Sequence, residues 1–207
     1  MRKILLIAKA AILGLFQTGS AYGNTGLIDR PLAVVQQKSD FFVFFNFAPI
    51  GKKASNGTTV TSFKPTGEAF RPLVTLEVTT GPRDAIQGLR LFVSRSFIDD
   101  RKKTIYAADL VKSFLENAGV ASSDDAIARL AQEISARALA GSSVTMIMAG
   151  PAPQAPSQIS AAYQAYSGKG PGQTVANAAG SVQVSLRNET RDSTPVLELV
   201  MSAIASK

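Results

Sequence analysis

LVTLEVTT, residues 73–80, alternates apolar and polar side chains with a strict period of two. Because successive side chains of a strand point to opposite faces, Val74, Leu76 and Val78 should face a core while Glu77 faces water. One buried face and one solvated face are typical of antiparallel sheets. The stretch therefore predicts a strand of such a sheet, ended by the Gly-Pro pair that follows it.

The segments on either side continue the same pattern. GLRLFVSRS, residues 88–96, alternates in the same way and predicts a neighbouring strand. On the other side, Asn56 and Gly57 readily adopt the positive φ values of a tight turn, so we expect the chain to reverse there into a strand over residues 58–63.

Further strands are expected towards the C-terminus. SVQVSLRN (181–188) and PVLELVMSA (195–203) alternate around a polar connection and predict a terminal β-hairpin. The short apolar run VTMIM (144–148) predicts a buried strand. The sheet should thus hold five to seven strands.

FFVFFNF, residues 41–47, contains five of the eleven phenylalanines of the chain. Aromatic residues favour strands, so we expect a strand over residues 41–48, with Phe42 and Phe44 on one face and the remaining aromatic side chains on the other. Since both faces would be apolar, the strand should lie in the middle of the sheet. Three interpretations remain open for the cluster: a packed core, a subunit interface, or a cavity for an apolar ligand.

Two helices are predicted between the strands. In residues 104–119, apolar side chains recur at steps of three and four. Residues 122–139 repeat this pattern after Ser122 or Ser123 as the cap, with Asp124 and Asp125 placed favourably against the helix dipole. The short connection indicates a helical hairpin. The predicted class is α+β, a largely antiparallel sheet with a helical hairpin packed on one face.

One long segment, residues 150–180, is rich in proline, glycine and alanine. It offers few large apolar side chains, so we expect a long surface loop. Tyr163 and Tyr166 lie in it, and they are candidate binding residues because tyrosine provides contact area at a low cost in entropy. The alternative is that they hold the loop against the sheet.

The first 23 residues are typical of a secretory signal peptide, with a basic start, an apolar run and small residues at the end. We expect cleavage after Ala21 or Gly23, a single domain over residues 24–207, and a secreted or periplasmic location in a bacterium. The apolar run is too short to span a bilayer as a helix. The alternative is an uncleaved amphipathic helix, because Lys9 interrupts the run.

Composition restricts the chemistry. The chain has no cysteine and no histidine, which excludes disulfides, Ser-His-Asp and Cys-His arrangements, and metal sites built from thiolate or imidazole. We therefore expect no cofactor and no metal. Removal of the leading segment would lower the net charge from +7 to +4, and no basic track marks a nucleic-acid partner.

Three functional hypotheses follow. The first is a non-enzymatic domain that binds another envelope or extracellular protein through the edge of the terminal hairpin or through residues 150–180, with self-association into a homo-oligomer also considered. The second is a soluble carrier of a small apolar ligand housed against Phe42 and Phe44. The third is a hydrolase that uses carboxylates or a Ser-Lys pair, with Asp99, Asp100 and Lys169 as its polar groups, although the two aspartates are better explained as surface ion pairs.

Overall fold

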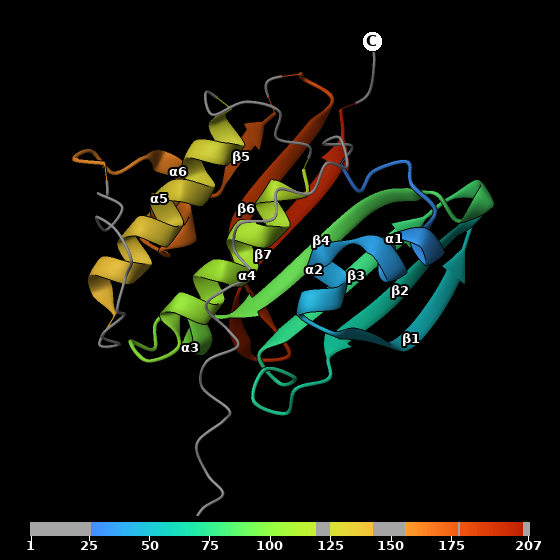
Figure 1. The fold of residues 1–207 in the computed structure, drawn as a ribbon, viewed down its shortest axis with the longest axis horizontal. Helices are drawn as coiled ribbons and strands as arrows, with labels where there is room; N and C mark the ends of the chain where they lie inside the picture. Colours follow the sequence, from blue (N-terminus) through green and yellow to red (C-terminus); the bar gives the residue numbers. More distant parts are fainter. Residues whose placement is uncertain (1–25, 119–124, 143–155, 178, 205–207) are drawn as a thin grey trace, which may run out of the picture.

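The structure, a computed structural model, describes residues 26–118, 125–142, 156–177 and 179–204. Its strands form a seven-stranded antiparallel sheet in the order β1-β2-β3-β4-β7-β6-β5 (Figure 1). The strands are β1 (Phe47–Ser55), β2 (Thr58–Pro65), β3 (Val74–Thr80), β4 (Ile86–Ser94), β5 (Gln173–Ala176), β6 (Val182–Arg191) and β7 (Thr194–Ala203). The predicted α+β class with a largely antiparallel sheet is confirmed.

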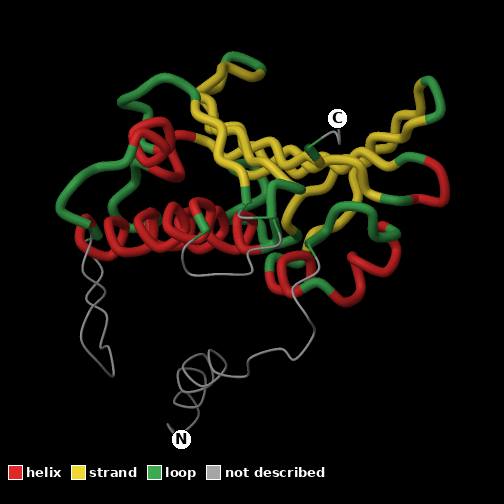
Figure 2. The backbone as a smooth tube through the Cα atoms, turned by 90° about the horizontal axis from the view of Figure 1, so that it is seen from above, coloured by secondary structure: helices red, strands yellow, loops and turns green. Residues whose placement is uncertain are grey.

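Most of the helical residues lie on one side of this sheet (Figure 2). The helices are α1 (Leu32–Lys38), α2 (Asp40–Phe44), α3 (Arg95–Ile98), α4 (Thr104–Glu116), α5 (Ala126–Gly141) and α6 (Ala161–Tyr166), with one 3₁₀ turn at Pro82–Asp84. Helix α4 packs against α5, as the predicted helical hairpin requires. Among the described residues, no helix is both long enough and apolar enough to cross a membrane.

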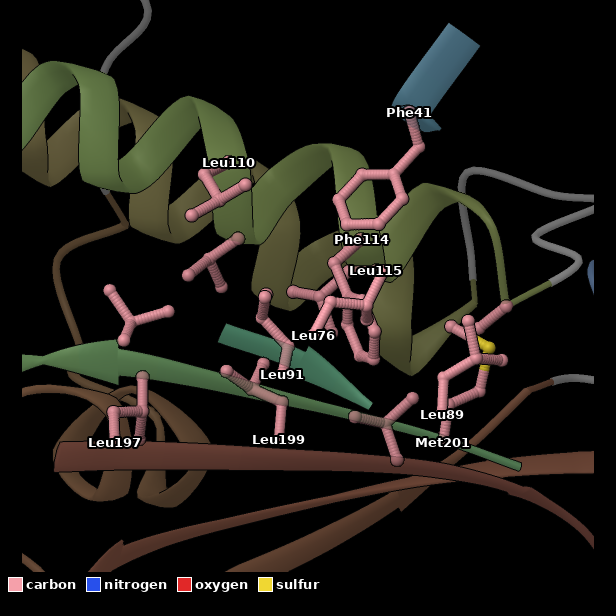
Figure 3. Packing of buried hydrophobic residues seen from close by; sticks show 14 of the residues in the cluster. Phe41, Leu76, Leu89, Leu91, Leu110, Phe114, Leu115, Leu197, Leu199 and Met201 are labelled. Carbon is pink, nitrogen blue, oxygen red and sulfur yellow. The ribbon is translucent and has the colours of Figure 1, made fainter. Parts of the chain in front are cut away.

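The apolar stripe of α4 explains how the helical layer joins the sheet. Leu110, Phe114 and Leu115 are buried and point towards the strands in Figure 3. They meet the inward face of the central strands, where Leu76 of β3 lies opposite Leu91 of β4. Burial of this stripe, rather than the intrinsic propensity of α4, supplies most of its stabilisation.

Helix α5 begins at a side-chain cap. The carboxylate of Asp125 accepts hydrogen bonds from the backbone amides of Ile127 at 2.7 Å and Ala128 at 3.4 Å. These amides have no partner within the helix, so the cap satisfies them. Ser122 and Ser123, the predicted caps, lie outside the described residues, as do residues 1–23 and the predicted strand at 144–148.

The prediction of a central strand over residues 41–48 is wrong. Residues Asp40–Phe44 form helix α2, and β1 begins only at Phe47 and lies at an edge of the sheet. Asn46 explains the change of direction, because it adopts a positive φ of 47° and its backbone amide donates to the carbonyl of Val43 at 3.2 Å. An asparagine in this conformation ends a helix and redirects the chain.

Residues 150–180 also depart from the expected long loop, since their described part contains α6 and β5. Ser160 starts α6, with its hydroxyl accepting from the backbone amide of Tyr163 at 3.0 Å. Tyr166 is buried and packs into the hydrophobic core, which supplies the large apolar contact that the composition seemed to lack. Tyr166, together with the buried Ala165, anchors this short helix in the core.

The terminal hairpin, β6 and β7, is interior to the sheet. Strand β7 pairs with β4 and β6, and β6 pairs with β5 on its other side. Strand β5 covers only Gln183–Leu186 of β6, so the expectation that the hairpin edge recruits a partner stays a prediction for the remainder of β6, up to Arg191. The edges of the sheet are β1 and β5. Of these, β1 carries Lys52 and Lys53, charges that discourage edge-to-edge pairing.

Candidate apolar binding groove

A groove of about 680 Å³ lies on the helical side, between α2, the β2–β3 connection, α3 and α4. Most of its lining side chains are apolar or aromatic. They are Phe44, Phe45, Asn46, Pro65, Thr66, Gly67, Phe70, Val74, Phe97, Ile105, Tyr106, Asp109 and Leu110. The size is within the range of roughly 300–1,000 Å³ that is usual for small-molecule sites.

Helix α2 supplies the first wall. Its last residue, Phe44, is 71% exposed, and its ring centroid lies 4.9 Å from that of Phe45 in an edge-on contact. The amide side chain of Asn46 donates a hydrogen bond to the Thr66 hydroxyl, and the backbone amide of Thr66 donates to the Asn46 carbonyl at 3.1 Å. These two bonds join the end of α2 to the end of β2 and fix the position of the wall.

The connection between β2 and β3 supplies a second part of the lining. The backbone amides of Phe70 and Arg71 both donate to the carbonyl of Gly67 at 3.0 Å, which closes a compact turn. This turn presents the Phe70 ring 5.6 Å from Phe97 of α3 and 6.1 Å from Tyr106 of α4, measured between ring centroids. Aromatic side chains from three elements therefore converge on one concave surface.

Residues of the core form the floor of the groove. Val74, Phe97 and Leu110 are buried and belong to the hydrophobic cluster. Tyr106, in contrast, is 54% exposed and lies at the open side. The floor of the groove is therefore part of the hydrophobic core.

Asp109 is the single lining residue, among those described, that carries a formal charge at neutral pH. Desolvation by the surrounding protein raises the pKa of its carboxyl, and this outweighs the opposing influence of Lys112. Lys112 itself is paired with Glu116, with 2.9 Å between Nζ and Oε1. The Asp109 carboxylate is therefore part of a groove lining whose other described residues are uncharged.

The structure separates the two phenylalanines that the sequence singled out. Phe44 lines the groove, but Phe42 is buried in the core, where its ring centroid lies 5.5 Å from Phe63 and 5.9 Å from Phe47. The cavity was expected beside both Phe42 and Phe44. The structure has an open groove instead, and of these two phenylalanines only Phe44 lines it. Phe42 acts in packing.

Tyr163 and Tyr166 lie elsewhere, on α6, beside a smaller cavity of about 170 Å³. The Arg137 guanidinium stacks over the Tyr163 ring at 5.1 Å from its centroid. Arg95 donates to the backbone carbonyls of Tyr166 at 2.6 Å and Ser167 at 3.0 Å. These contacts hold α6 against the rest of the fold, and a binding role for the two tyrosines stays a prediction.

The polar groups of the hydrolase hypothesis do not gather in the groove. Asp99 lies 2.6 Å from a guanidinium nitrogen of Arg95, and Asp100 lies 3.5 Å from Lys103 Nζ, so both form surface ion pairs. Lys169 is exposed. In the part of the chain that the structure describes, no group of three or more acidic side chains could hold a metal ion.

Phe70, Tyr106 and Asp109 were missed in the sequence analysis. The helical stripe of α4 gives a signal for Tyr106 alone, because this large aromatic residue is placed off the buried stripe. No known protein family, curated protein sequence or solved structure matches this chain. The functional assignment therefore depends on the groove itself.

Proposed function

We propose that this protein is a non-enzymatic binding protein, or carrier, for a small apolar ligand that occupies the groove. One observation supports the proposal: exposed aromatic side chains are collected on a single concave surface of about 680 Å³, where Phe44 is 71% exposed. Isolated exposed apolar residues are ordinary on protein surfaces, whereas a contiguous concave patch is typical of a ligand site.

The energetics favour such a ligand. Removing apolar surface from water contributes about 25 cal/mol per Å². The rings of Phe44, Phe70 and Tyr106 remain partly in water in the free protein, so a ligand that covers them gains this contribution without displacing any core residue. Hydrogen bonds at Asn46 and Thr66 already hold one wall in place, which lowers the entropy cost of binding.

The proposal includes export. The basic and apolar start of the chain, residues 1–23, supports delivery to the periplasm or the extracellular medium. Mass spectrometry of the intact protein from its native host should find a chain that begins at Tyr22 or Asn24. A full-length chain retained in the cytoplasm would overturn this part of the proposal without affecting the groove.

Binding can be tested with the neutral apolar fluorophore N-phenyl-1-naphthylamine. We expect saturable binding to the wild-type protein, and weakening by roughly fivefold in Phe44→Ala, since the loss of ring contacts is worth about 1 kcal/mol. Val43→Ala is a matched control, because Val43 is also on α2 and is 59% exposed but does not line the groove. Circular dichroism should show the same fold for both variants.

Two results would contradict the proposal. One is the absence of saturable binding; the other is equal weakening by Phe44→Ala and Val43→Ala. Solvent extraction of the natively purified protein, followed by mass spectrometry, gives an independent readout in which a stoichiometric apolar compound is expected. A stoichiometric protein partner that covers Phe44, with no extractable compound, would instead favour the hypothesis of an interaction domain.

A further inference from the structure

The described part of the groove lining contains acidic and aromatic side chains but no basic ones. Among its described lining residues there is one carboxylate, Asp109, and no lysine or arginine. The aromatic rings at the open side, Phe44, Phe70 and Tyr106, present faces with negative electrostatic character. Carboxylate and ring faces therefore favour the same sign of ligand charge.

Asp109 is positioned to act on a ligand. It lies three residues after Tyr106 on α4, so the two side chains lie on the same side of the helix, and both line the groove. The carboxylate forms no hydrogen bond or ion pair with any described residue. Lys112, one turn further along, forms its ion pair with Glu116 at 2.9 Å, and its charge acts on Asp109 only as the weaker influence that opposes desolvation.

We infer that the groove selects an apolar amphiphile whose polar end is a cation, with the ammonium or similar group beside Asp109 and the aromatic rings and the tail in the groove. This inference rests on the proposed function, since it names the class of ligand for the same site. An ammonium group gives Asp109 an ion-pair partner that no described residue supplies, and because Asp109 is exposed the expected gain is that of a surface ion pair.

Anionic amphiphiles are disfavoured by the same features. A ligand carboxylate at this position would meet Asp109 and the ring faces with no basic lining residue to compensate it. A neutral ligand would gain only the contribution of its tail. The expected order of affinity is therefore cation, then neutral molecule, then anion.

Three probes with the same eight-carbon tail test this order: octylammonium, octanol and octanoate, each titrated against bound N-phenyl-1-naphthylamine at neutral pH. We expect octylammonium to displace the fluorophore at a concentration about five- to tenfold lower than octanol, the sum of an exposed ion pair and a cation–π contact. Octanoate should be the weakest. In Asp109→Asn, octylammonium should lose the ion-pair part of this advantage and keep the cation–π part, while octanol is unchanged.

Glu68→Gln is the matched control, because Glu68 is an exposed acid in the β2–β3 connection that does not line the groove. If it reduces the affinity for octylammonium as much as Asp109→Asn does, the preference comes from general surface charge and the inference is wrong. Equal affinities for octylammonium and octanol would also overturn the inference, while leaving the proposed apolar site intact. Failure of the fluorophore and of all three probes to bind would instead remove the proposed function.

Discussion

Nε of Arg90 lies 2.8 Å from Oε1 of Glu198, on the face of the sheet opposite the helices. Glu198 is fully buried, and it also accepts a hydrogen bond from Arg187. The guanidinium groups of Arg90 and Arg191 stack over the Phe92 ring, at 5.1 and 4.1 Å from its centroid. This face thus pairs its charges internally and covers its own aromatic residue, whereas the groove leaves both its carboxylate and its rings available.

Replacing Glu198 with glutamine should lower the free energy of unfolding at pH 7 by about 2 kcal/mol, since two charge-assisted hydrogen bonds lose their ionised acceptor. Both arginines are partly exposed, so water compensates for some of the loss. Urea denaturation followed by circular dichroism measures the change. Glu189→Gln is the control, because Glu189 pairs with Arg187 at a more exposed position and should cost less than about 0.5 kcal/mol.

The same variant should remove part of the dependence of stability on pH. Burial by itself would raise the pKa of Glu198, but hydrogen bonds from Arg187 and Arg90 outweigh burial and hold the pKa below its ordinary value of 4.5. A lowered pKa in the folded state stabilises the fold above pH 4.5, and this contribution is lost as the pH falls through the folded pKa. The difference between wild type and Glu198→Gln should therefore shrink below pH 4.5, and an unchanged difference would contradict the assignment.

The strands and long helices were predictable because their patterns persist over many residues. The alternation in 73–80 continues across the sheet, so Leu76 lies opposite Leu91 and Glu77 lies opposite Arg90, as a half-buried antiparallel pair requires. Helix α4 spans Thr104–Glu116, and over this length its helical pattern of apolar residues can be distinguished from a chance pattern.

Residues 41–47 could not be assigned correctly because the segment is short and almost uniformly aromatic. Five helical residues do not complete a recognisable period, and phenylalanine favours strands. Tertiary contacts decide the outcome: the Phe41 ring lies 5.8 Å from Phe114 of α4 and 5.2 Å from Phe47. The groove was unpredictable for a related reason, since its walls come from segments distant in sequence, and only Phe44 attracted notice.

Removal of the Tyr166 hydroxyl should stabilise the protein. The hydroxyl oxygen is buried and has no hydrogen-bond partner among the described residues, and burial raises the pKa of this phenol well above its ordinary value of 10.0. An unsatisfied buried polar group costs about 1–3 kcal/mol, so Tyr166→Phe should raise the free energy of unfolding by about 1 kcal/mol. Tyr106→Phe, at an exposed position, should have no measurable effect. A loss of stability in Tyr166→Phe would instead indicate a bound water or ligand at the hydroxyl.

The cap of α5 gives a further prediction. Asp125→Ala should lower the free energy of unfolding by about 1–2 kcal/mol, because the backbone amides of Ile127 and Ala128 lose their acceptor. Asp125→Ser keeps a capping oxygen and should recover most of the loss. Equal denaturation midpoints for the alanine and serine variants would show that the cap is not the source of the effect.

The turn between β1 and β2 allows the cost of backbone strain to be measured without a change in side-chain packing. Asn56 and Gly57 have φ values of 48° and 77° and join strands whose flanking residues, Ser55 and Thr58, pair directly. A Cβ atom at Gly57 would meet no neighbour within 4 Å, so any cost of Gly57→Ala arises from its positive φ and should be about 1 kcal/mol. Gly51→Ala also meets no atom within 4 Å but has no positive φ, so it should be neutral or stabilising by about 0.5 kcal/mol. Urea denaturation of the two variants in parallel measures the difference, and equal stabilities would mean that the turn adopts another backbone conformation in solution.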